Sequence, residues 1–240
     1  MANNYYDSTG VLVLDKVTPV ITALFGDFKL DADYPGNGEA YIAKFSEDND
    51  PNWDDIRDSL VELAQVMGLT ASDSVDDGNN GWLRALCAHF GDKDDELVSE
   101  IAGFEDSADV ANLYRVAQRL DDGHGLKAIK VEGGWHCDKP RLFEFGGVGE
   151  YIGRDCYVSS ISSDAVLFGP KLQATLTADD LDTGADEILA KLTDILDGVY
   201  DKTKREALKQ KLVAKLAPLT FNLVTNDSQP TLRVDMASAA

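Results

Sequence analysis

The chain has little cysteine, few basic side chains relative to its acidic ones, and no long apolar run. Its three cysteines, Cys87, Cys137 and Cys156, are an odd number at irregular spacing, which favours reduced thiols over a disulfide framework. No stretch of about 18 apolar residues occurs, so an ordinary membrane-spanning helix is excluded. Residues 1–7 show no basic region followed by an apolar segment, so no secretory signal is expected. These absences predict a cytoplasmic protein without a membrane partner.

The composition is that of a folded protein. Of the 240 residues, 44% are hydrophobic and 27% are charged, so the chain lacks the low hydrophobicity that marks disordered sequences. The length fits one large domain or two small ones. We expect an acidic α+β region over 1–120 and an antiparallel β-meander plus a helical hairpin over 121–240. The alternative is one continuous domain.

The shortage of basic side chains is concentrated in the first half of the chain. Lys and Arg total 22 against 43 Asp and Glu, which gives a formal charge of -21. Residues 1–110 hold 24 of the acidic and 6 of the basic side chains, a net charge of -18. Such a field repels nucleic acid and anionic membrane surfaces and attracts basic proteins. Direct nucleic-acid binding through this half is therefore not expected.

Capping residues and apolar periodicity predict the elements of the first half. Thr18-Pro19 opens a short helix, and the turn-forming segment 34–38 joins two strands in a hairpin. Asp50-Pro51 repeats the cap-plus-proline signal before a helix that runs to residue 68. Together with these, a strand is expected at 11–14, hairpin strands at 27–33 and 39–46, and helices at 82–90, 92–103 and from about 107 to 120.

The second half reads first as strands and then as helices. Glycine and proline clusters separate expected strands at 126–131, 141–145, 151–159 and 166–176, and the short connections imply an antiparallel meander. Apolar residues at helical spacing then predict a helical hairpin over 185–200 and 202–217. The fold class is therefore α+β.

Histidine, cysteine and glycine patterns give no catalytic or cofactor signature. His124, His136, Cys137 and Cys156 have zinc-compatible side chains, but their spacing matches no finger or ribbon, so turn or core roles are the stronger interpretation. The glycine-rich segment 145–153 lacks the spacing of a phosphate loop and is interpreted as a turn between strands. We expect no metal and no cofactor.

A calcium loop was tested over 48–59, where several carboxylates follow one another. The sixth and twelfth positions of that loop, which need glycine and glutamate, hold Trp53 and Ser59. The calcium interpretation is therefore rejected.

Carboxylates on and before the 51–68 helix form the candidate partner-binding site. Residues spaced by three and four positions share a helix face, so three of these side chains form one row. Like charges at that spacing cost stability, which invites a functional explanation, although acidic faces also aid solubility. The candidate residues are Glu47, Asp48, Asp54, Asp55, Asp58 and Glu62.

A basic segment follows in the helix over 202–217. It carries six Lys or Arg side chains against one Glu and is expected to pair with the acidic half or with a second copy of the chain.

Three functions follow from this distribution of charge. The leading hypothesis is a non-enzymatic inhibitor or decoy whose carboxylates occupy the groove of a basic, nucleic-acid-binding protein. DNA-mimic antirestriction and anti-CRISPR proteins are similar to it in charge character. The alternative is a homo-oligomeric interaction or assembly protein. The third is a carboxylate-based enzyme with a dispersed site that includes Trp53, Trp82 or Trp135.

Overall fold

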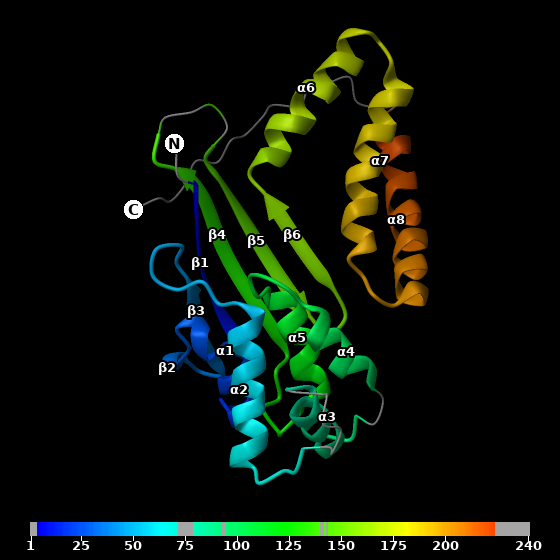
Figure 1. The fold of residues 1–240 in the computed structure, drawn as a ribbon. Coiled ribbons are helices and arrows are strands. Elements are labelled where there is room, and N and C mark those ends of the chain that lie inside the picture. Colours follow the sequence, from blue (N-terminus) through cyan, green and yellow to red (C-terminus); the bar gives the residue numbers. More distant parts are fainter. Residues whose placement is uncertain (1–3, 72–78, 93–94, 140–141, 143, 224–240) are drawn as a thin grey trace.

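The computed structural model describes residues 4–71, 79–92, 95–139, 142 and 144–223, and its centre is a six-stranded antiparallel sheet (Figure 1). The strand order is β2-β3-β1-β4-β5-β6, and every neighbouring pair is antiparallel. The predicted α+β class, with an early β-hairpin, a meander and C-terminal helices, is confirmed. The strands are β1 (Asn4–Val13), β2 (Asp31–Gly36), β3 (Glu39–Lys44), β4 (Ala128–Cys137), β5 (Gly146–Gly153) and β6 (Tyr157–Ile161).

The middle of the sheet joins the two halves of the chain. Strand β1 pairs with β4 along all ten of its residues, from Asn4 opposite Cys137 to Val13 opposite Ala128. Strands from both sides of residue 120 therefore belong to one sheet. The division of the chain into two domains near that residue stays a prediction.

Five helices cover one face of this sheet and enclose the core (Figure 1). Sheet residues such as Leu12, Ile42 and Ile129 pack there against helical residues such as Leu24 and Ile56. The helices are α1 (Pro19–Phe25), α2 (Trp53–Val66), α3 (Asn80–His89), α4 (Asp95–Gly103) and α5 (Val110–Arg119), and a short 3-10 helix, η1 (Gly26–Phe28), follows α1.

Side-chain caps fix where these helices begin. The Thr18 hydroxyl accepts a hydrogen bond from Ile21 N at 3.5 Å and so caps α1, as predicted. Helix α2 is capped by Asn52, whose Oδ1 accepts from Asp55 N at 3.0 Å, and not by Asp50. Asp50 instead forms an ion pair with Lys44 at 2.6 Å.

The predicted strand over 166–176 is wrong, because this segment lies in helix α6 (Ser163–Thr177). A short apolar run cannot be assigned to a strand or a helix by periodicity alone, and length decides between them. Here Leu172, Ala174 and Leu176 favour helix, and Pro170 is tolerated within it.

The glycine-rich segment predicted as a turn is strand β5. Gly146 leaves room for an aromatic side chain on the neighbouring strand, since a Cβ there would collide with the Trp135 ring. The strand expected over 141–145 falls partly outside the described residues, and Glu144 and Phe145 precede β5 without belonging to it. The strand expected over 151–159 is divided by a turn into the end of β5 and β6.

The chain ends in a second group of helices beyond the β6 edge of the sheet (Figure 1). These are α6, α7 (Leu181–Asp197) and α8 (Lys202–Leu223). The Asp180 carboxylate accepts from Thr183 N at 3.1 Å and begins α7, and the Asp201 carboxylate accepts from Thr203 N at 2.7 Å and begins α8. The predicted helical hairpin is present as α7 and α8.

None of the helices in the described part of the chain combines the length and the apolar character that a membrane span requires.

Candidate interaction surfaces

The six predicted carboxylates all lie on the surface, and they come from two segments of the chain. Glu47 and Asp48 belong to the loop after β3, whereas the other four project from the first three turns of α2. Asp55, Asp58 and Glu62 are exposed at spacings of three and four residues, so they share one face of α2. We call these three residues the acidic ridge.

Local cations and amides neutralise part of this acidity. Asp48 pairs with Lys29, and Asp54 pairs with Arg57. The Arg57 guanidinium also donates to the Ile101 and Phe104 carbonyls at 3.1 and 2.8 Å, which ties α2 to the end of α4. These cations come from the acidic half itself and not from the basic segment near the C-terminus.

Unlike Asp48 and Asp54, the carboxylates of the acidic ridge have no cationic partner among the described residues. Asn79 donates to Asp58 Oδ1 at 3.1 Å, and Asn52 donates to Asp55. Neither donor is a cation. Within the described part of the chain no ion pair involves the ridge, so no neighbouring cation offsets its charge.

Carboxylates whose pKa departs from its ordinary value do so downwards and at the surface. A hydrogen bond from Lys44 lowers the pKa of Asp50, and one from Lys127 lowers the pKa of Asp15. Lys204 acts in the same way on Asp155. A lowered carboxylate pKa beside a lysine is ordinary for an ion pair at the surface.

The histidine and cysteine candidates do not gather into one group in the described part of the chain. His124 is buried behind α5, where Leu126 N donates to its Nδ1 at 2.8 Å and its Nε2 lies 3.0 Å from the Ala117 carbonyl. His136 is exposed and stacks on Tyr5, and Cys156 lies in the turn before β6. The described residues hold no group of three or more metal-ligating side chains.

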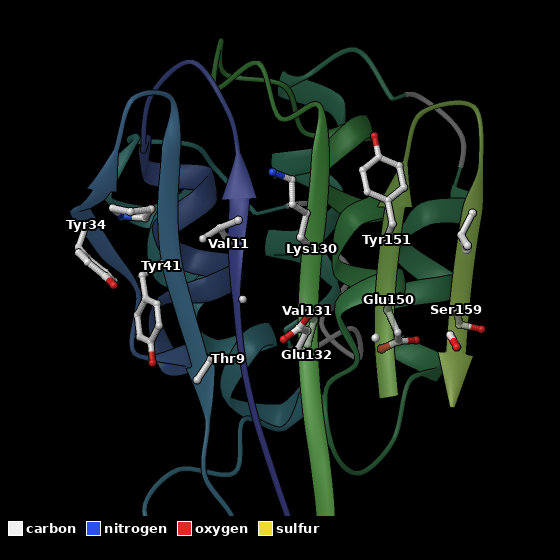
Figure 2. Close-up of a pocket in the computed structure, with 15 residues that line it drawn as sticks. Thr9, Val11, Tyr34, Tyr41, Lys130, Val131, Glu132, Glu150, Tyr151 and Ser159 are labelled. Atoms are coloured by element: carbon white, nitrogen blue, oxygen red, sulfur yellow. The ribbon is translucent and has the colours of Figure 1, made fainter. Parts of the chain in front are cut away.

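The face of the sheet opposite α1–α5 is open (Figure 2). One row crosses it through directly paired residues, from Tyr41 on β3 through Val11 and Lys130 to Tyr151 on β5, and Figure 2 shows these side chains on the near side of the strands. They line a shallow hollow of about 600 Å³ together with Tyr34. Lys130 is paired with Glu39 at 2.7 Å, so the row is aromatic rather than cationic.

Helices α6–α8 carry large apolar side chains that the rest of the fold does not cover. Among the described residues between 163 and 217, only Gly184 is buried. We call the exposed large apolar side chains of these helices the apolar helical surface. They are Val166, Leu167, Leu176, Leu181, Ile188, Leu189, Ile195, Leu208, Val213 and Leu216.

Helix α7 presents the clearest stripe of this surface. Leu181, Ile188 and Ile195 recur every seven residues and therefore lie on one face of the helix. They are 60%, 46% and 62% exposed, whereas core residues of comparable size in α1–α5 are nearly fully buried. Contiguous apolar patches on a protein surface mark interaction sites, whereas single exposed apolar residues are ordinary.

Charges of opposite sign flank this surface on α7 and α8. Helix α7 carries five acidic side chains and the single cation Lys191, while α8 carries six basic side chains and the single acid Glu206 over 202–217. Arg205 pairs with Asp197 at 3.2 Å within the hairpin. Among the residues that the structure describes, three acids of α7 and three lysines of α8 form no ion pair: Asp182, Asp186, Asp194, Lys202, Lys211 and Lys215.

The apolar periodicity of α7 predicts a helix from the sequence, but it does not indicate whether another element covers the apolar face. The exposure of these side chains depends on which elements the chain brings against them, and that is a tertiary property. Comparison with known proteins adds no assignment, since no protein-family model, curated protein or solved structure matches the chain.

Proposed function

We propose that the chain is an assembly protein that binds a second copy of itself through the apolar helical surface. The observation that supports this proposal is the group of ten exposed large apolar side chains on α6–α8. Each of these side chains is about half exposed, so its burial by a partner contributes about 1 kcal/mol, roughly half of the value for full burial. A partner that covers α7 and α8 therefore gains a large apolar contribution.

Charge complementarity favours a second copy as this partner. The unpaired acids lie on α7 and the unpaired lysines on α8, so one chain offers both signs on neighbouring helices. A two-fold interface brings the same patch of each copy together, so α7 of one chain can face α8 of the other. Both sets of charges then gain partners at the rim of the apolar contact.

Ile195→Glu tests this proposal, with Val66→Glu as the matched control. Both positions are exposed helical residues with apolar side chains, but Val66 lies at the end of α2 and is 79% exposed. Sedimentation velocity should show an oligomer for the unmodified chain and for Val66→Glu, and a monomer for Ile195→Glu. Equal behaviour of the two variants, or a monomeric unmodified chain at about 0.1 mM, would contradict self-assembly.

The decoy is a second candidate, and the acidic ridge is the observation that favours it. Asp55, Asp58 and Glu62 project together from α2 without a cation to neutralise them, as a mimic of successive phosphates requires. The triple variant D55N/D58N/E62Q should then lose capture of a nucleic-acid-binding protein that the unmodified chain retains at about 0.1 M salt. Equal capture by both chains would refute the role of the ridge.

A further inference from the structure

Three of the eight arginines of this acidic chain line one pocket. The pocket has a volume of about 520 Å³ and lies between α5, the end of β5 and the turn that joins α7 to α8. Arg115 and Arg119 reach it from α5, and Arg154 reaches it from the turn after β5. We call it the arginine pocket.

The rest of its lining combines aromatic and aliphatic side chains with Glu100 and Gln118. Tyr114, Ile152 and Tyr200 contribute, and they come from three separate parts of the chain. Tyr200 is held over the pocket because its backbone N donates to the Asp155 carbonyl at 3.1 Å. Burial is the main cause that raises the pKa of the Tyr114 and Tyr200 hydroxyls, so both rings are neutral at physiological pH.

Two of the three guanidinium groups already have carboxylate partners. Arg115 pairs with Glu100, and Arg119 pairs with Asp92 at 2.5 Å. Arg154 forms no hydrogen bond and no ion pair with any residue that the structure describes. The side chains that line the pocket therefore carry two more positive than negative charges, in a molecule whose net charge is -21.

We propose that the arginine pocket binds a small organic anion, with an aromatic or apolar body and a phosphate or carboxylate group. Guanidinium groups offer planar pairs of N–H donors that match the oxygens of these anions, and Arg154 is the donor without a partner. The rings of Tyr114 and Tyr200 and the Ile152 side chain provide apolar contact for the body of the ligand. A volume of about 520 Å³ suits a ligand of this kind.

Isothermal titration calorimetry with the full chain and phenyl phosphate tests the proposal. Arg154→Gln removes the unpaired guanidinium and should weaken binding about tenfold or more, because a hydrogen bond between charged groups is lost. Lys16→Gln is the matched control, since Lys16 is an exposed lysine of the loop between β1 and α1, lies outside the pocket lining and forms no ion pair among the described residues. It should change the affinity less than about twofold. Arg154→Lys retains the charge and should fall between the two variants.

Three further probes separate the sources of binding energy. Inorganic phosphate should bind more weakly than phenyl phosphate, and benzyl alcohol, which has a ring but no charge, should not bind. Benzoate shows whether the anionic group is a carboxylate rather than a phosphate. The proposal fails if neither phenyl phosphate nor benzoate binds, or if Lys16→Gln weakens binding as much as Arg154→Gln does. Circular dichroism of each variant checks that the fold is retained.

Discussion

His124→Leu should destabilise the fold, because His124 is a buried link between α5 and the segment that precedes β4. Leu126 N donates to Nδ1 at 2.8 Å, so this nitrogen carries no proton, and Nε2–H donates to the Ala117 carbonyl at 3.0 Å. Both ring nitrogens are therefore occupied within the protein. Leucine keeps the side chain large and apolar but can accept no hydrogen bond.

The expected loss in the free energy of unfolding depends on which backbone group is left without a hydrogen-bond partner. The Ala117 carbonyl still accepts from Leu120 N at 3.2 Å, so it remains satisfied in the variant. Leu126 N loses its acceptor in a buried position, and an unsatisfied buried donor costs about 1–3 kcal/mol. A loss of about 2 kcal/mol lowers Tm by about 4–8 °C for a chain of this size.

Differential scanning calorimetry of three variants measures this effect. His124→Asn supplies an amide oxygen near the position of Nδ1 and should recover part of the stability. His89→Leu is the control because His89 is exposed at the end of α3, and its Tm should change by less than about 2 °C. Equal Tm values for the unmodified chain and His124→Leu would refute the structural role of this histidine.

Two other predictions concern thiol reactivity and acid stability. Burial raises the pKa of Cys87 to about 12, so this thiol stays protonated at pH 8. It should react with Ellman's reagent only after denaturation, whereas the partly exposed Cys156 should react in the native chain. Equal native rates for the two thiols would contradict this. The Asp50 pKa lies below its ordinary value of 3.8, so the ion pair with Lys44 stabilises the fold above that pH and loses its effect as the pH falls through the lowered pKa. The urea midpoint of Asp50→Asn should therefore lie below that of the unmodified chain at pH 7, and the difference should vanish near pH 2; a difference that persists there would refute the assignment.

Local signals predicted much of the fold. The Thr18-Pro19 pair indicates the start of α1, and the apolar spacing over 53–66 indicates the buried face of α2. Both signals lie within a single helix, so they can be found in the sequence. The segment 166–176 was misassigned because a short apolar run fits a strand and a helix equally well. The glycine-rich segment predicts a turn, but it forms β5, and the side chain that requires glycine at position 146, the ring of Trp135, lies on the adjacent strand.

The candidate sites depend more strongly on tertiary structure. The acidic ridge could be predicted because its three residues belong to one helix. The arginine pocket could not, since Arg115, Arg154 and Tyr200 are brought together only by the pairing of the β5 turn with the α7–α8 turn. The stripe through Ile188 was visible as periodicity, but periodicity does not tell whether an apolar face is covered by the same chain.

Sedimentation equilibrium of the unmodified chain over a wide concentration range tests the proposed self-assembly most directly. The measurement is made at about 0.1 M and about 0.5 M salt, because screening acts on the charges of α7 and α8 and not on apolar burial. We expect a defined oligomer that dissociates on dilution. At about 0.5 M salt its association should be weaker, so it should dissociate at a higher protein concentration than at about 0.1 M salt. A monomer at every concentration in both buffers would contradict assembly through the apolar helical surface.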